Sequence, residues 1–114
     1  MKILSIMTIA ASDSSKPPGQ SEMEAMGAFM AELRSKGALV DTGGRMPEML
    51  ELIVTRKKGG TTIIDGPFTE AKEVVGGFAL LDVEDRAEAI AVTNRFLDIM
   101  GDATCHLHEV GPTP

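Results

Sequence analysis

The residue types best suited to chemistry lie in one short turn, Asp65-Gly66-Pro67-Phe68, which follows an apolar, strand-like run at residues 61–64. The residue before a proline avoids the α-helical region, and proline itself fixes φ and donates no backbone hydrogen bond. The strand must therefore end near Asp65, and Phe68 can fold back into apolar surroundings. Two roles are open to Asp65. It fixes the turn by accepting backbone N–H groups, or it lies at the mouth of a cleft, where burial would raise its pKa and suit it to general-base catalysis.

Arg45 is a second candidate, because it follows Gly43-Gly44 in a predicted loop that could line the same cleft. A guanidinium group there would clamp an anionic small molecule through paired hydrogen bonds. The alternative is an ordinary charge on a surface loop.

His106 and His108 are separated by one residue in the last predicted strand, so their side chains point to the same face. Two imidazoles at this spacing can begin a metal site, which needs a third ligand. Glu109 points to the opposite face with Cys105, and the chain has no other His or Cys, which leaves Asp65 as the other acid to consider. A solvated or partner-facing histidine pair is the alternative that we favour, with Cys105 as a small buried hydrophobic residue.

Length and composition describe a single globular domain that spans residues 1–114, with 43% hydrophobic residues. The net charge of −6 argues against a nucleic-acid partner, which requires clustered Lys and Arg. The single cysteine excludes an internal disulfide and fits the reducing cytoplasm. The apolar run at 3–11 is too short to span a membrane, and no phosphate-binding loop or nucleophile elbow is present. We therefore expect a cytoplasmic protein without a cofactor.

Hydrophobic patterns and turn residues predict the strands. They lie at residues 1–9, 38–40, 50–56, 61–65, 77–83 and 104–110, with a short helical turn at 69–74. The strands at 50–56 and 61–65 form a hairpin joined through residues 57–60. The Gly-Gly pair at 43–44 breaks the strand before it, and the pair at 76–77 fits a bulge or a close backbone approach.

Two helices are predicted from capping boxes, Ser21 with Glu24 and Asp85 with Glu88. A glycine ends each helix. The apolar stripes expected to face the core are Met23, Met26, Phe29, Met30 and Leu33 in the first helix, and Ala89, Ile90, Val92, Phe96, Leu97 and Met100 in the second.

The order of these elements forms two β-α-β units in the split arrangement, with both helices on one face of an antiparallel sheet. The strands that carry Ile6, Ile63 and Leu81 also place apolar residues on the opposite face, which a lone domain would expose. A second copy is the simplest cover, and a twofold dimer is the commonest symmetry. We therefore expect a homodimer.

Residues 64–73, Ile-Asp-Gly-Pro-Phe-Thr-Glu-Ala-Lys-Glu, are followed by Gly-Gly-Phe-Ala-Leu-Leu at 76–81. This order closely resembles the YCII-related, or DGPF-domain, family of small bacterial proteins, and the resemblance covers nearly the whole chain. It implies a ferredoxin-like α+β fold with an antiparallel sheet that pairs into a dimeric α/β barrel. It implies no settled activity, because most members are uncharacterised.

The resemblance also bears on partners and chemistry. Some family members are encoded beside, or fused to, extracytoplasmic-function sigma factors. One branch places a His in the first helix with a nearby Asp as a catalytic pair. This chain departs from that branch, because residues 21–30 contain no His.

Two functions follow from the sequence. The first is binding of a small molecule in a cleft, with Asp65 as its polar group, Arg45 as a clamp, and Phe68 and Phe78 among its apolar walls. Catalysis there is unassigned. The second is an interaction module that accompanies a sigma factor, for which the acidic surface suits a basic partner.

Overall fold

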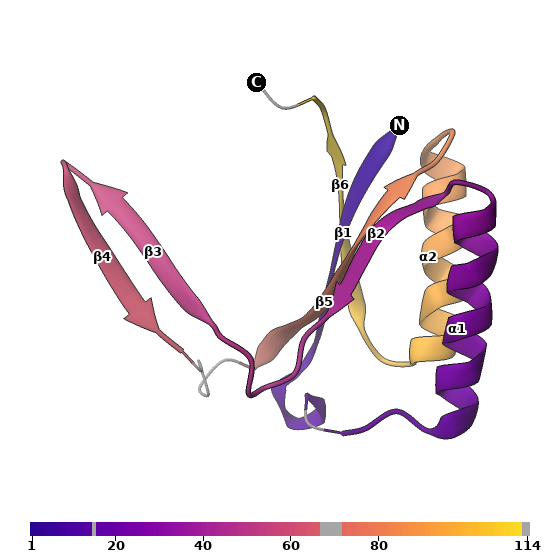
Figure 1. Ribbon diagram of the computed structural model, residues 1–114, viewed down its shortest axis with the longest axis horizontal. Helices are drawn as coiled ribbons and strands as arrows, with labels where there is room; N and C mark the ends of the chain where they lie inside the picture. The colour runs from indigo at the N-terminus through magenta and orange to yellow at the C-terminus, as the bar shows by residue number, and fades with distance from the viewer. Residues whose placement is uncertain (15, 67–71, 113–114) are drawn as a thin grey trace.

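The computed structural model describes residues 1–14, 16–66 and 72–112. Four strands form one antiparallel sheet in the order β2-β5-β1-β6, and both helices cover the same face of it (Figure 1). The remaining two strands form a separate hairpin, which lies between β2 and β5 in the sequence but outside the sheet. This is the predicted ferredoxin-like α+β arrangement of two β-α-β units. The elements are β1 (Lys2–Ala10), a 3₁₀ turn (Ala11–Asp13), α1 (Gln20–Ser35), β2 (Leu39–Gly44), β3 (Leu52–Lys57), β4 (Gly60–Asp65), β5 (Glu73–Asp82), α2 (Arg86–Met100) and β6 (Thr104–Val110).

The two faces of the sheet have different environments, because side chains alternate along each strand. In β1, Ile3, Ser5 and Met7 are buried beneath the helices. Leu4 and Ile6 point the other way and are only half-buried. We call this second side the open face. By strand register it carries Leu4 and Ile6 from β1, Phe78 and Leu80 from β5, and His106 and His108 from β6.

The helices begin differently from one another. The Asp85 carboxylate caps α2 by accepting the Glu88 backbone N–H at 2.8 Å, as predicted. The Glu88 carboxylate accepts the N–H of Glu84, one residue before the cap, at 3.1 Å. The capping box predicted at Ser21 is wrong, since α1 begins at Gln20 and Gly19, two residues before Ser21, takes the cap position. Among the described residues, neither helix is long and apolar enough to cross a membrane.

The buried stripes are confirmed at their centres, where Phe29 and Leu33 in α1 and Ala89 and Val92 in α2 are buried. They are wrong for three outer residues, since Met23 is 61% exposed and Ile90 and Met100 are exposed too. Met23 lies in the first turn of α1 and Met100 in the last turn of α2. These two ends lie at the same edge of the helical layer (Figure 1), so the layer packs less closely there.

The hairpin is confirmed and projects away from the body on the side opposite the helices (Figure 1). We call residues 52–65 the arm. Lys58 and Gly59 link its strands with φ values of 48° and 80°, which is the two-residue turn that matches the twist of paired strands. The helical turn predicted at 69–74 is wrong for Glu73 and Val74, which begin β5. It is also wrong for Lys72, which is a bend, and residues 69–71 lie outside the described residues.

Glycines let β2 and β5 approach closely at the end of the sheet. Strand β2 continues through Gly43 and Gly44 instead of breaking there. The bulge predicted at 76–77 is confirmed, because Met7 pairs with Gly77 and Thr8 pairs with Val75, which leaves one extra residue in β5. A Cβ atom on Gly77 would lie 2.7 Å from the Gly43 carbonyl oxygen, so only glycine fits this position without a backbone shift.

One ion pair joins the helices to each other. Two Arg95 guanidinium nitrogens donate to the Glu32 carboxylate at 2.5 and 3.1 Å. The same guanidinium lies 4.7 Å from the centre of the Phe29 ring. The Arg95 hydrogen bond is the main reason that the pKa of Glu32 is lowered from 4.5 to about 2.

Gly77→Ala should lower the free energy of unfolding by about 1–3 kcal/mol, because its methyl group would overlap the backbone of β2. Gly27→Ala is the control. A Cβ on Gly27 meets nothing within 4 Å in an exposed helical position, so alanine should stabilise α1 by up to about 1 kcal/mol. Urea denaturation of both variants checks the prediction. An equal effect of the two substitutions would contradict the close approach of β2 and β5.

Arg95→Gln should return the pKa of Glu32 from about 2 toward 4.5, because it removes the donor that favours the carboxylate. In the wild type, the stabilisation from this pair is complete above pH 4.5 and declines as the pH falls toward 2, because the folded-state pKa is the lower one. Carboxyl NMR titration of Glu32 measures the change. Arg34→Gln, an exposed neighbour on α1, serves as the control and should leave the titration where it is.

Candidate functional site

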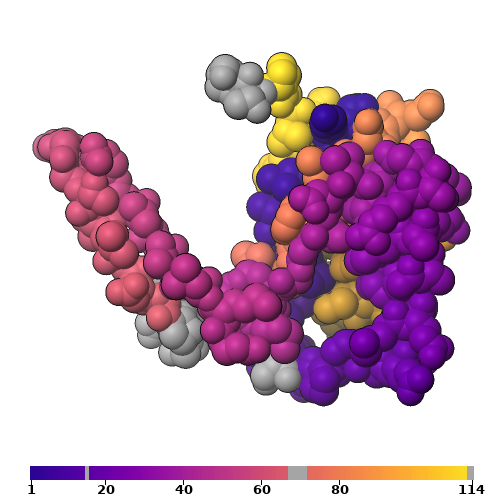
Figure 2. Space-filling view, in the orientation of Figure 1, coloured from indigo at the N-terminus to yellow at the C-terminus, as the bar shows by residue number. Residues whose placement is uncertain are grey.

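A cavity of about 390 Å³ lies between the sheet and the two helices. Figure 2 shows its opening between β2 and α1, with α2 visible inside. Its position follows from the glycine pairs of β2 and β5, which have no side chains to fill the space beneath the outer ends of the helices. The lining residues are Ser5, Met7, Phe29, Met30, Leu33, Leu39, Thr42, Gly43, Gly44, Gly76, Gly77, Phe78, Ala79, Leu81, Val92, Thr93, Phe96, Met100 and Cys105.

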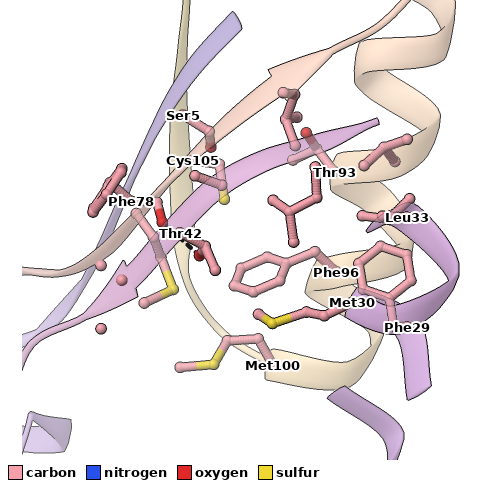
Figure 3. Close-up of a pocket in the computed structure, with 18 of the residues that line it drawn as sticks. Ser5, Phe29, Met30, Leu33, Thr42, Phe78, Thr93, Phe96, Met100 and Cys105 are labelled. Atoms are coloured by element: carbon pink, nitrogen blue, oxygen red, sulfur yellow. Dashed lines mark hydrogen bonds between the residues drawn. The ribbon is translucent and has the colours of Figure 1, made fainter. Parts of the chain in front are cut away.

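Apolar side chains make up most of the cavity wall. Figure 3 shows Met30 from α1 and Phe96 and Met100 from α2 gathered on the side away from the strands. Methionine adapts its shape to an irregular neighbour, which suits this wall to ligands of varied outline. Phe29, which also belongs to the buried core, lies in the wall with the Arg95 guanidinium over its ring. The ion pair between the helices therefore contacts a cavity residue.

The polar groups of the cavity lie mostly on its sheet side. Thr42 and Thr93 each donate a 2.8 Å hydrogen bond to a backbone carbonyl, of Phe78 and Ala89 respectively. Ser5 and Cys105 lie side by side on neighbouring strands (Figure 3).

The cavity is uncharged at neutral pH. Burial raises the pKa of the Cys105 thiol, and the hydrogen bond with the Ser5 hydroxyl opposes this only in part. The thiol is therefore held in its neutral form, which is a poor nucleophile. No Asp, Glu, Lys, Arg or His lines the cavity within the described part of the chain. The arrangement can enclose an apolar molecule, and it offers two weak hydrogen-bonding groups.

Arg45 lies elsewhere, in a smaller hollow of about 180 Å³ beside the β5 bulge. Its guanidinium pairs with the Glu51 carboxylate at 2.9 Å, and its backbone N–H donates to the Gly76 carbonyl at 2.9 Å. The Glu51 carbonyl in turn accepts the N–H of Gly66 at 2.7 Å. These contacts fix the base of the arm to the sheet. The role of Arg45 as an anion clamp stays a prediction.

The structure does not bring the predicted cleft residues together in one hollow. Asp65 is exposed at the end of β4, opposite Leu52, and lines neither the cavity nor the hollow at Arg45. Phe78 belongs to the cavity wall through its backbone, and its ring points away toward the open face (Figure 3). Phe68 lies outside the described residues. A functional role for the Asp65 carboxylate stays a prediction.

His106 and His108 share the open face as predicted, and both are exposed. They lie beside Ile6 and Leu4 of β1. Cys105 points to the helix side, also as predicted. Over residues 1–14, 16–66 and 72–112, no three His, Cys, Asp or Glu side chains gather as a metal site would require.

Sequence reasoning missed the cavity itself. It assigned Met30, Leu33 and Phe96 to an ordinary core and left Ser5, Thr42 and Thr93 unconsidered. The available signal was the combination of two Gly-Gly pairs in strands with methionines in both helices. That signal becomes specific only once β2 and β5 are known to be neighbours.

Comparison with known proteins identifies a family for this chain. No curated protein is significantly similar to the chain. The family model of the YCII-related domain matches residues 1–96, which is most of the chain. The match includes β1, α1, the arm, β5 and most of α2, and therefore most of the cavity wall. The chain thus belongs to the YCII-related domain family.

Proposed function

We propose that this protein binds a small, largely apolar molecule in the cavity between its sheet and its helices. The observation that carries the proposal is the cavity volume of about 390 Å³, enclosed chiefly by aliphatic, aromatic and methionine side chains. Ligand sites commonly measure about 300–1,000 Å³ and combine apolar walls with few polar groups. A close-packed core of this size would hold no comparable void.

The uncharged wall selects the chemical class of the ligand. An ionised ligand would lose its hydration inside the cavity and meet no opposite charge there, which is costly. A neutral molecule with one hydroxyl or carbonyl group could place that group at Ser5 and Cys105, the polar pair on the sheet side. We assign binding and not catalysis, because the Cys105 thiol has a raised pKa and no other group in the wall titrates near neutral pH.

The cleft expected near Asp65 is the other location for the ligand. There the Asp65 carboxylate would fix the ligand, with Arg45 as its neighbour at the base of the arm. In a single subunit the exposed position of Asp65 provides little apolar enclosure, so the cavity is the stronger location. The two locations predict different sensitivities to substitution.

We also propose that the functional unit is a homodimer formed through the open face, as the family resemblance implies. Leu4 and Leu80 form one adjacent pair on this face, and Ile6 and Phe78 form another. All four are partly exposed, Phe78 the most at 41%. A continuous apolar face on a sheet is expected to be covered.

An interaction module beside a sigma factor is the second candidate. The specific observation in its favour is the exposed apolar surface of the arm, which is typical of a protein-docking element. Affinity purification from native lysate separates this role from ligand binding. A stoichiometric sigma factor in the eluate supports the module, and its absence opposes it.

Binding of N-phenyl-1-naphthylamine, a neutral aromatic dye that fluoresces in apolar surroundings, tests the cavity. The wild type should bind one dye molecule per subunit. Ala79→Phe fills the cavity from β5 and should weaken binding by about tenfold or more, equal to about 1.4 kcal/mol. Ala91→Phe adds the same side chain to an exposed position of α2 and should leave binding unchanged.

Asp65→Asn distinguishes the two locations in the same titration. It should leave the affinity for the dye unchanged if the ligand lies in the cavity. Loss of binding in Asp65→Asn with normal binding in Ala79→Phe would place the site at the arm and overturn the cavity. Circular dichroism and urea denaturation confirm that each variant is folded.

A further inference from the structure

The arm has apolar side chains on both of its faces, although it is only two strands wide. Strand alternation places Leu52, Val54 and Ile63 on one face and Ile53 and Ile64 on the other. All five are between 40% and 60% exposed. A lone two-stranded hairpin is marginally stable in water. The arm as it stands therefore lacks a surface against which to pack.

The exposed surface area of this chain is larger than that of a compact monomer of the same mass. The chain exposes 8103 Å², whereas a compact monomer of 12.1 kDa exposes about 6,000 Å². Its radius of gyration is 15.9 Å, against about 13 Å for a compact chain of this length. The surplus area is on the order of 2,000 Å², which exceeds the roughly 800 Å² that each partner buries in a standard interface.

The arm and the open face lie on the same side of the molecule, and a wide notch separates them (Figures 1 and 2). The base of the arm is fixed by the Arg45–Glu51 ion pair and by the Gly66–Glu51 backbone hydrogen bond. Arg45 also donates from its backbone to Gly76 of β5. The arm is thus anchored to the sheet and held away from it, which leaves room for another layer of protein.

The charge of the arm complements the remainder of the chain. Its tip carries Arg56, Lys57 and Lys58 in succession. Of the 11 basic and 17 acidic residues in the chain, three basic and two acidic residues lie in 50–66, which leaves a net charge of −7 elsewhere. Exposed carboxylates occur at both ends of the sheet, including Glu73 at one end and Asp82 at the other. A second copy of this chain therefore offers acidic groups to the tip.

We propose that the arm is a dimerisation element that closes over a second copy of this chain. The apolar side chains of the arm pack against the body of the second copy at its open face, and the basic tip meets the carboxylates there. The contact is reciprocal, so the arm of each subunit packs on the other subunit in one twofold assembly. The proposal rests on the homodimer proposed above and is independent of the ligand.

Removal of the arm tests the proposal directly. The hydrogen bond between the Gly66 N–H and the Glu51 carbonyl brings these two residues together, so Gly-Gly can replace residues 52–65 without straining the body. Sedimentation velocity should show the wild type as a dimer at micromolar concentration. The shortened chain should have a dissociation constant at least about 100-fold higher, equal to about 2.8 kcal/mol, with the circular dichroism of both helices retained.

Charge reversal tests the tip with a matched control. Arg56→Glu with Lys57→Glu should weaken the dimer by about tenfold at low salt, and added salt should reduce the difference. Arg34→Glu with Arg86→Glu makes the same change in net charge at exposed positions of the helices. It should have a clearly smaller effect, because the helices lie on the far side of the sheet (Figure 1).

The outcomes separate the arm from the dimer. A shortened chain that dimerises as tightly as the wild type overturns the arm proposal and leaves the dimer through the open face intact. A monomeric wild type overturns both. If the shortened chain does not fold, Val54→Thr with Ile63→Thr replaces it, since threonine keeps the strand preference and removes apolar surface from one arm face. Unchanged affinity in that variant and in the tip reversal also overturns the arm proposal.

Discussion

The packing of two short helices on one face of a four-stranded sheet determines the other features of this molecule. At one end of the sheet the packing is close, and Ile3, Leu33, Leu81, Val83 and Ala89 are buried together. At the other end, paired glycines in β2 and β5 supply no side chains, and the outer turns of the helices carry exposed methionines. The cavity lies at this end. The cavity therefore results from the lack of side chains between the helical layer and the sheet at this end.

The same limited helical layer explains why the opposite side of the molecule is apolar. Two helices of 16 and 15 residues cover one face of the sheet and none of the other. The open face and the arm then carry apolar side chains that no described segment of this subunit covers. Both surfaces lie on one side, with the base of the arm fixed to β5 through Arg45 and Glu51. A single partner can cover both of them at once.

The sequence predicted the elements better than their relations to one another. Periodicity and turn residues located β6, α2 and the hairpin, since Asp85 acts as a local cap and the turn residues Lys58 and Gly59 adopt positive φ values. Ser21 had the sequence pattern of a cap, but Gly19 has the extended backbone of the cap position and Ser21 lies inside the helix. The bulge at Gly76 was predictable from the glycine pair alone.

The candidate site was less predictable, because it depends on contacts between distant residues. Gly44 and Gly77 lie 33 positions apart, and their pairing creates the space that the helices then enclose. Asp65 and Phe78 were expected to share one cleft. Asp65 instead lies at the base of the arm, opposite Leu52, and does not line the cavity. No local pattern encodes the angle at which the arm leaves the sheet. The end of the strand at Asp65 was correctly located, while the separation of Asp65 from the cavity was not foreseen.

The central claim is that a second copy covers the apolar surface of the arm. Amide hydrogen exchange tests this claim, when it is measured by mass spectrometry over a dilution series. A lone two-stranded ribbon opens at almost no free-energy cost, so its amides exchange rapidly. We expect peptides from β3 and β4 to be protected at micromolar concentration and to lose that protection on dilution, while β1 remains protected. Rapid exchange of the arm at every concentration, or protection that dilution does not change, would contradict the account.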